Sequence, residues 1–368
     1  IIKRAEMLAE LMRFSYGIAV AGTHGKTSTT SIVSHILNEA NYDPTYIIGG
    51  KLINAGNSKL GSSDYLIAEA DESDASFLHL QPLMSLITNI DKDHLENHQN
   101  SFDILKKNFL EFINNLPFYG LCLLNLNDIN TKSIISKISR PVKTYGLDIM
   151  ADYKAKSIDL DSIPSKYLYL ENDKEYEINL NMPGRYNAMN SLAALSIARE
   201  LDVPIKTIQK AIENFPGISR RFEIVGEYKI NNKKFVWIDD YGHHPTEMKE
   251  VLETINNVWR NKKILMIFQP HRYSRTAEHF SHFVDILKNV NNLVLMDVYA
   301  ANEAAIDNIS SKVLIDEIRK YNKNIELIND HKKLEKYINQ KLNENDILLT
   351  MGAGDISKFK NYYKNSLI

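Results

Sequence analysis

Along the first 125 residues, short apolar runs alternate with segments in which apolar residues recur every three to four positions. The runs have the length of buried strands, and the periodic segments are typical of helices. The runs predict strands at 17–22, 64–71, 83–91 and 121–125. The periodic segments predict helices at 4–13, 27–40 and 101–115. Because strands that alternate with helices usually form a mostly parallel sheet covered on both faces, this part predicts an α/β domain.

The pattern changes twice further along the chain. Residues 150–182 are polar with short alternating patches, which predicts a small antiparallel insert, and helices are predicted at 187–201 and 204–214. The segment FPGISRRFE (215–223) carries Pro and Gly and reads as a domain junction. A second α/β pattern follows it. Its strands are predicted at 234–240, 263–268, 293–298 and 346–351, and its helices at 245–259, 274–288, 310–320, 332–342 and 355–366.

Composition narrows the class of protein. The 368 residues suffice for two domains, and a net charge of −2 gives no reason to expect a nucleic-acid or membrane partner. No apolar stretch is long enough to cross a bilayer. The single cysteine, Cys122, lies in an apolar run, so we expect a buried core thiol and a reducing, cytoplasmic location.

The segment VAGTHGKTSTT (20–30) joins a predicted strand to a predicted helix and resembles a phosphate-binding loop. In the usual pattern, G-x-x-x-x-G-K-[ST], the first glycine would stand where this chain has Val20, and the nearest glycine is Gly22. A glycine-rich turn before a helix lets backbone N–H groups approach phosphate oxygens. In such a loop Lys26 would contact the β- and γ-phosphates, and the Thr27 hydroxyl would bind Mg²⁺.

Two further polar clusters follow predicted strands of the first domain. The run EADESDASF (69–77) holds four carboxylates, and Glu69 still lies within the apolar run. Mg²⁺ prefers oxygen ligands, so beside a phosphate loop this run predicts a metal ligand, although a solvated acidic turn would look similar. His94, in TNIDKDHLENH (88–98), follows the next strand and suits either a functional or a structural role.

The second domain carries two such clusters. WIDDYGHHPTE (237–247) ends one strand with two carboxylates and two histidines, and FQPHRYSRT (268–276) ends the next. The latter holds Arg272 and Arg275, which are three residues apart and could grip a carboxylate or a phosphate. A surface ion-pair network is the alternative, and two clusters on successive strand ends favour a site.

Seven motifs together resemble the Mur ligase family, in order and along nearly the whole chain. They are GTHGKTSTT, EADESDASFLHLQP, TNIDKDHLENH, GRYNAMNSLAA, SRRFE, DDYGHHPTE and PHRYSRT. The family's loop lacks the first glycine of the usual pattern, which would account for Val20. The resemblance implies an ATP-dependent ligase that forms amide bonds in peptidoglycan synthesis. It also implies a P-loop central domain with a mostly parallel sheet and a C-terminal Rossmann-like α/β domain.

Roles for individual residues follow from the same resemblance. For ATP, it implies binding by Gly22, Thr23, His24, Gly25, Lys26, Thr27, Ser28, Asn187, Asn190, Arg221 and Asp240. The two asparagines would lie near adenine, Arg221 would face the phosphates and Asp240 the ribose. Thr27, Glu69 and His94 would bind Mg²⁺, and Lys26, Glu69 and His94 would be catalytic. His243, Arg272 and Arg275 would hold the incoming amino acid.

The resemblance also implies the substrates, UDP-N-acetylmuramate and L-alanine, with ATP and Mg²⁺. Family members have three domains, whereas here residues 1–16 resemble the linker that follows the first one. We therefore expect a central domain at 17–219 and a C-terminal domain at 220–368, and little ligase activity from this chain by itself. Some members carry a carbamylated lysine, which neither Lys106 nor Lys107 matches convincingly.

Three alternatives remain open from the sequence. The first is the related ligase that attaches recycled murein tripeptide, against which the run ESDASFLHLQP argues. The second is an unrelated P-loop ATPase or kinase. The third is a truncated fragment that binds ATP without turnover. Oligomeric state and regulation are not indicated by the sequence.

Overall fold

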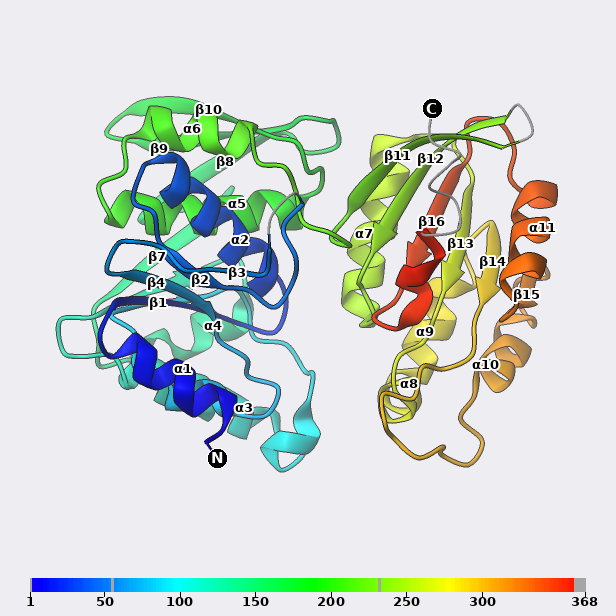
Figure 1. Ribbon diagram of the computed structural model, residues 1–368, viewed down its shortest axis with the longest axis horizontal. Coiled ribbons are helices and arrows are strands. Elements are labelled where there is room, and N and C mark those ends of the chain that lie inside the picture. The colour runs from blue at the N-terminus through cyan, green and yellow to red at the C-terminus, as the bar shows by residue number, and fades with distance from the viewer. Residues whose placement is uncertain (1, 54–55, 231–232, 361–368) are drawn as a thin grey trace. The chain divides into compact units, whose positions relative to one another are not determined.

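The computed structural model describes residues 2–53, 56–230 and 233–360 (Figure 1). The chain divides into two compact units, Ile1–Ser219 and Arg220–Ile368. Each unit is built on its own sheet, and each is described by itself below.

In the described part of the first unit, ten strands form one sheet in the order β10-β9-β8-β7-β6-β5-β1-β4-β2-β3. Their bounds are β1 Tyr16–Ala21, β2 Thr45–Ile47, β3 Ser58–Lys59, β4 Tyr65–Glu69, β5 Met84–Ile87, β6 Leu121–Asn125, β7 Val142–Leu147, β8 Tyr153–Asp159, β9 Ser165–Glu171 and β10 Lys174–Leu180. Neighbouring strands from β8 to β2 in this order run parallel. Strands β3, β9 and β10, at the two edges of the sheet, pair antiparallel.

Helices cover both faces of this sheet, as Figure 1 shows. Their bounds are α1 Arg4–Met12, α2 Lys26–Glu39, α3 Phe102–Asn114, α4 Ile129–Ile134, α5 Arg185–Glu200 and α6 Ile205–Glu213, with short 3₁₀ turns η1 Ser76–His79, η2 Leu95–His98 and η3 Ile135–Lys137. On one face α2, α5 and α6 pack into a single apolar core through residues such as Ile36, Leu195 and Ile208. On the other face Met12 of α1 and Phe109 of α3 lie in a second core. The predicted α/β architecture is therefore confirmed.

Among the described residues of the second unit, six strands form a sheet in the order β11-β12-β16-β13-β14-β15. The strands are β11 Glu223–Ile230, β12 Lys233–Asp240, β13 Ile264–Phe268, β14 Asn292–Leu295, β15 Ile325–Leu327 and β16 Ile347–Met351. The helices are α7 Pro245–Val258, α8 Tyr273–Glu278, α9 Phe280–Leu287, α10 Ser311–Ile318 and α11 His331–Lys341, with the 3₁₀ turn η4 Asp355–Phe359. Pairing is parallel except between β11 and β12. Phe283 of α9 packs on Phe268, while Phe359 of η4 packs on Trp237.

Some predicted elements differ from those observed. The antiparallel strands predicted within 150–182 exist, but they extend the main sheet because β8 pairs with β7. The single helix predicted at 274–288 is wrong, since the backbone of His279 leaves the helical region between α8 and α9. The helix predicted at 355–366 lies partly outside the described residues, and its described part contains η4.

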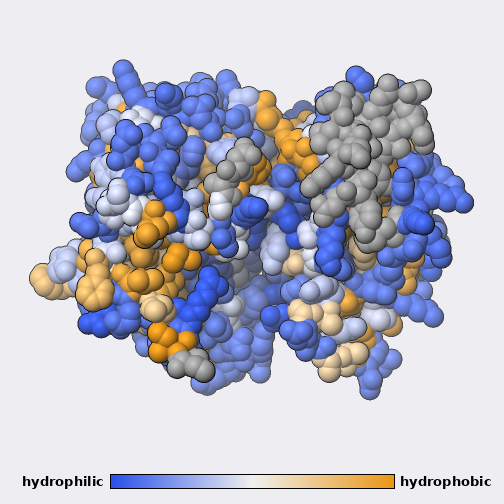
Figure 2. Space-filling view, viewed as in Figure 1, coloured by the Kyte–Doolittle hydropathy of each residue, from blue (hydrophilic) through white to orange (hydrophobic). Residues whose placement is uncertain are grey.

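The surface of the first unit carries apolar side chains over α1, which Figure 2 shows as an orange strip. Ile2, Met7, Leu11 and Phe14 are exposed there. Cys122 of β6 is fully buried, as predicted. None of the helices in the described ranges has both the length and the apolar character required to span a membrane.

Candidate functional site

The phosphate-binding loop of the first unit occupies Gly22–Gly25, between the end of β1 and the start of α2. Strand β1 lies between β4 and β5, which both run parallel to it. Val20 is the last but one residue of this strand and its side chain is fully buried in the core. An apolar side chain is therefore required where the longer loop pattern has glycine, and the turn begins two residues later.

Both glycines of the loop are required by its geometry. Gly22 has φ +132° and Gly25 has φ +83°, a region that L side chains rarely adopt. A Cβ atom on Gly22 would meet the Thr88 hydroxyl, and one on Gly25 would meet the side-chain amide of Asn190. The loop can therefore pack closely against its neighbours only with glycine at these two positions.

The segment that follows β5 braces this loop. The backbone N–H of Thr23 donates to the Asn89 carbonyl (3.1 Å), and that of His24 donates to the Asn89 side-chain oxygen (2.8 Å). In return, the Thr88 hydroxyl and the Asn89 amide donate to the His24 carbonyl (2.6 and 3.0 Å). The amides of Thr23 and His24 thus shape the loop, and the N–H groups of the first turn of α2 are left to face an anion.

Lys26, the first residue of α2, folds back over the loop. Its ammonium donates to the carbonyls of Gly22 (2.7 Å) and Thr23 (3.1 Å) and forms an ion pair with Glu72 (2.7 Å). Burial by itself would lower the pKa of Lys26, but the Glu72, Glu69 and Asp71 carboxylates outweigh it and raise that pKa. Lys26 is therefore a fixed cation at the centre of the loop.

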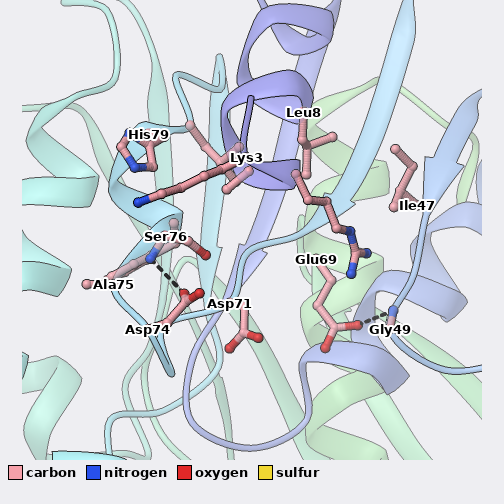
Figure 3. Close-up of a pocket in the computed structure, with 14 residues that line it drawn as sticks. Lys3, Leu8, Ile47, Gly49, Glu69, Asp71, Asp74, Ala75, Ser76 and His79 are labelled. Atoms are coloured by element: carbon pink, nitrogen blue, oxygen red, sulfur yellow. Dashed lines mark hydrogen bonds between the residues drawn. The ribbon is translucent and has the colours of Figure 1, made fainter. Parts of the chain in front are cut away.

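Glu69 and Thr27 lie in direct contact. The Thr27 hydroxyl donates to both carboxylate oxygens of Glu69 (3.0 and 3.1 Å), and the Gly49 N–H orients the same carboxylate (2.7 Å). Figure 3 shows Glu69 and Gly49 at the edge of a cavity of about 490 Å³, which Lys3 and Asp71 also line. A hydroxyl and a carboxylate in direct contact form a set of oxygen donors of the kind that Mg²⁺ takes.

Glu69 ends β4 and His94 lies in the segment after β5, and these two strands lie on either side of β1. The ring of His94 lies 3.5 Å from the Asp93 carboxylate and 3.8 Å from that of Glu96. The structure records no direct contact between His94 and Glu69 within the described residues, so their approach to one metal stays a prediction.

The two asparagines of α5, Asn187 and Asn190, make different contacts. Asn190 receives a long hydrogen bond from the Thr29 hydroxyl (3.4 Å) and covers Gly25, so it contacts the loop directly. Asn187 is buried, and its side-chain amide donates to the Pro183 carbonyl (2.8 Å). Ser28, in the first turn of α2, is buried as well.

Asp240 and Arg221 lie close together in the second unit. The Asp240 carboxylate accepts hydrogen bonds from the Phe222 N–H (2.7 Å) and the Gly242 N–H (2.6 Å) at the end of β12. Burial raises the pKa of Asp240 to about 6, against the opposing charge of Arg221. The Arg221 guanidinium stacks over the Tyr241 ring at 4.9 Å and lies 3.7 Å from Glu247.

The residues predicted to hold the amino acid form one cluster in this unit. The rings of His243 and His271 are 5.7 Å apart, and the Arg275 guanidinium lies 3.4 Å from Nδ1 of His271. Arg272, at the start of α8, lies 4.0 Å from Glu303, and 38% of the Arg272 side chain is exposed. Burial, with Arg275 and Arg272, lowers the pKa of His271 to about 4, so its ring is neutral at neutral pH.

Sequence reasoning missed several residues that shape these sites. Asn89 shapes the loop, Glu72 pairs with Lys26, and Glu303 accepts from the Ser274 backbone and hydroxyl beside Arg272. Asn89 and Glu72 were visible as polar residues at predicted strand ends, but their partners depend on which strands are adjacent. Glu303 lies far along the chain, and no local pattern marks it.

Two family models match this chain. Residues 20–198 match the Mur ligase middle domain, and residues 220–354 match the Mur ligase glutamate ligase domain. Among solved structures, UDP-N-acetylmuramate-alanine ligase from Thermotoga maritima is similar with a TM-score of 0.77 and 29% identity, over 98% of this chain and 78% of that one. A murein peptide ligase from Psychrobacter arcticus shares the fold, with a TM-score of 0.72 and 23% identity over 98% of this chain and 79% of that one.

Curated relatives are more similar still. UDP-N-acetylmuramate–L-alanine ligase of Vesicomyosocius okutanii is 50% identical over 97% of this chain and 77% of its own length. The ligase of the same name from Hydrogenovibrio crunogenus is 46% identical over 99% of this chain and 80% of its own length. That from Ruthia magnifica is 46% identical over 100% of this chain and 79% of its own length.

Proposed function

This chain belongs to the Mur ligase family, and on that premise we propose that it joins L-alanine to the carboxylate of UDP-N-acetylmuramate, with conversion of ATP to ADP and phosphate. The observation that carries the proposal is the identity of 46% to 50%, over nearly the whole chain, to relatives that bear the name of this activity. The murein peptide ligase shares the fold at 23% identity, which gives no comparable support for a tripeptide substrate.

The proposed reaction has two steps, because a carboxylate is a poor electrophile. In the first, a muramoyl carboxylate oxygen bonds to the γ-phosphorus of ATP while the bond from that phosphorus to ADP breaks. In the second, the neutral amine of alanine attacks the carbonyl carbon of the acyl phosphate, phosphate leaves with the C–O electron pair, and the nitrogen loses a proton. The product is an amide, and peptidoglycan synthesis is the process that uses it.

The first unit would perform the first step. Lys26 is a cation at the centre of the loop, where it would stabilise the charge on the transferring phosphoryl group. The oxygens of Thr27 and Glu69 would hold Mg²⁺ with His94, and when bound this ion supplies charge neutralisation between the phosphate groups. We assign the rest of the loop, Gly22–Ser28, to the same phosphates.

The second unit would supply the amine. Arg272 and Arg275 would bind the alanine carboxylate, and His243 would line the same site, so that the amine is oriented toward the acyl phosphate. For the nucleotide we propose Asn187 and Asn190 near adenine, Arg221 at the phosphates and Asp240 at the ribose. The hydrogen bonds that Asp240 accepts from two backbone N–H groups fix its carboxylate in place.

We propose that residues 17–219 form the ATP-binding domain and residues 220–368 the amino-acid-binding domain. ATP and Mg²⁺ are the cofactors of this proposal, and its partners are the two small-molecule substrates. A cytoplasmic location stays a prediction, supported by the reduced state expected for the buried thiol of Cys122.

An omission assay tests the proposed function. ADP release is measured with Mg·ATP and UDP-N-acetylmuramate in the presence of L-alanine, of murein tripeptide or of neither. Because we expect little activity from this chain by itself, the assay uses the chain joined to the first domain of the family. Release should then be rapid with alanine and at least tenfold slower with tripeptide, in line with what a mismatched pocket costs. Preference for tripeptide would assign the recycling ligase, and release that is independent of any amino acid would assign an ATPase.

A further inference from the structure

Glu72 is a buried carboxylate that the proposed reaction does not use. It follows β4 by three residues, in the same acidic run as Glu69, and only 2% of its side chain is exposed. Isolated charges are very rarely buried, because removal from water disfavours the charged form. Its partner is Lys26, whose ammonium lies 2.7 Å from the Glu72 carboxylate.

The Lys26 ammonium has three close oxygen neighbours, which are two hydrogen-bonded carbonyls and the Glu72 carboxylate of the ion pair. An ammonium has three N–H groups, and here it contacts the carbonyls of Gly22 and Thr23 and the carboxylate of Glu72. Of these acceptors only Glu72 carries a full negative charge. A phosphate oxygen of ATP can contact the same ammonium only by replacing one of the three, and the side chain of Glu72 is the partner that stands outside the loop.

The backbone around Glu72 is held from a second loop. The ring of His98, in η2, contacts the Glu72 carbonyl through Nε2 (2.9 Å), while its Nδ1 contacts the side-chain amide of Asn108 on α3 (2.8 Å). Because the amide of Asn108 donates to Nδ1, the proton of the neutral ring is on Nε2 and is donated to Glu72. Asn97 also donates to the neighbouring Ser73 carbonyl (2.8 Å). These contacts fix the backbone that carries Glu72, so the carboxylate stays close when Lys26 moves.

We propose that Glu72 is a positioning residue that holds Lys26 within the loop of the nucleotide-free protein and competes with the phosphates of ATP for its ammonium. The inference rests on the proposed function, since it takes ATP as the ligand of this loop. Its consequence is that part of the attraction between Lys26 and ATP is offset by the loss of the ion pair. Removing the charge of Glu72 should therefore tighten ATP binding.

Proton uptake should accompany the replacement of Glu72 by a phosphate of ATP at the Lys26 ammonium. Burial raises the pKa of Glu72 to about 7, against the opposing charge of Lys26. The other charges that act on this pair are those of Asp71, in the same run, and Glu69, at the end of β4. Once Lys26 contacts phosphate, Glu72 faces anions without its cation, so its pKa rises further and it binds a proton. ATP affinity should then fall as the pH rises above about 7.

The test is calorimetric titration of ATP, with Mg²⁺, into the wild-type protein and three variants. At about pH 8.5 we expect Glu72→Gln to bind ATP about tenfold more tightly than the wild type, and to show a weaker pH dependence between about pH 6.5 and 8.5. Glu72→Asp retains the charge and should retain the pH dependence. Glu111→Gln is the matched control, because it removes an exposed carboxylate of α3 in the same unit and should change the Kd less than about twofold.

The outcomes separate this inference from the proposed function. A wild-type protein that binds no ATP would overturn the proposed function. A wild-type protein that binds ATP, beside a folded Glu72→Gln variant whose affinity is unchanged or weaker, would overturn the inference alone. Should that variant fail to fold, titration of the wild type at about pH 8 in two buffers of different ionisation enthalpy decides, and an absence of proton uptake contradicts the inference.

Discussion

The two units present cations to their ligands in opposite ways. In the first unit Lys26 is already paired with Glu72 and with two loop carbonyls, and Thr27 is paired with Glu69. In the second, Arg272 lies 4.0 Å from its nearest carboxylate partner, and Arg275 contacts a histidine whose lowered pKa keeps it neutral. The ion pair of Lys26 is therefore closer than that of Arg272, whose side chain is also more exposed, at 38% against 13%.

This difference suits the two proposed ligands. Triphosphate is a multiply charged anion that also brings Mg²⁺, so its attraction survives competition from a carboxylate in the loop. The carboxylate of an amino acid carries one charge, and it would bind weakly to guanidinium groups that were already neutralised. We therefore expect ATP to bind despite the close ion pair of Lys26, and the longer contact of Arg272 to leave its guanidinium available to a carboxylate.

Replacement of Lys26 should have the largest effect, because it removes the central cation of the paired site. Lys26→Ala loses charge-assisted contacts to two phosphates, each worth about 1.5–3 kcal/mol, so we expect ATP affinity to fall by about a hundredfold or more. Calorimetry of Mg·ATP binding measures this, with Lys107→Ala on the exposed side of α3 as the control. Unchanged affinity in Lys26→Ala would mean that the loop does not bind ATP.

The arginines of the second unit should respond selectively. In a chain joined to the first domain of the family, Arg272→Ala or Arg275→Ala should raise the KM for alanine by about tenfold to a hundredfold, since each removes one charge-assisted contact to a carboxylate. The KM for ATP should change little, and Arg319→Ala, at a partly exposed arginine of the same unit, should change neither. Equal increases in both KM values would indicate that these arginines bind phosphate.

Loop geometry is the next point at which the comparison can be sharpened. Gly25→Ala places a side chain at φ +83° and against Asn190, so the free energy of unfolding should fall by about 1–2 kcal/mol and ATP should bind more weakly. The double variant Gly25→Ala, Asn190→Ala removes the contact and leaves the backbone strain. If the double variant is as unstable as the single one, the whole loss of stability comes from the backbone angle φ. A Gly25→Ala variant as stable as the wild type would show that glycine is not required at this position.

The smallest expected effect concerns the neutral histidine of the cationic site. Because the pKa of His271 is lowered to about 4 in the folded protein, the unfolded chain binds a proton at higher pH than the folded one does. The stability contribution is present above about pH 6.5 and is lost as the pH falls toward about 4. Unfolding curves between these values should show a pH dependence about 1 kcal/mol smaller for His271→Asn, after allowance for partial exposure. Identical pH dependence would mean that the ring is not held neutral by Arg275 and Arg272.

Most of the fold and the position of the site could be predicted from the sequence, but the ion pairs within the site could not. Periodic apolar residues marked helices such as α2 and α5, and Gly25-Lys26-Thr27 between a strand and a helix marked the loop. Strands β2, β3 and β15 have only two or three residues and were missed, because so few residues show no periodicity. Strands β7 and β11 were also missed, although they have six and eight residues. The ion pair of Lys26 with Glu72 joins residues that are far apart in the chain, and it follows from β4 lying beside β1, which local pattern does not reveal.

If ATP activates the carboxylate that alanine then attacks, one oxygen atom passes from the substrate to phosphate, and an isotope transfer measures this step. UDP-N-acetylmuramate is labelled with ¹⁸O in its carboxylate and incubated with Mg·ATP, L-alanine and the chain joined to the first domain of the family. The released phosphate is then examined by mass spectrometry. An acyl phosphate hands one carboxylate oxygen to the phosphate that leaves, so we expect one ¹⁸O atom in each phosphate released. Amide product accompanied by unlabelled phosphate would contradict the account.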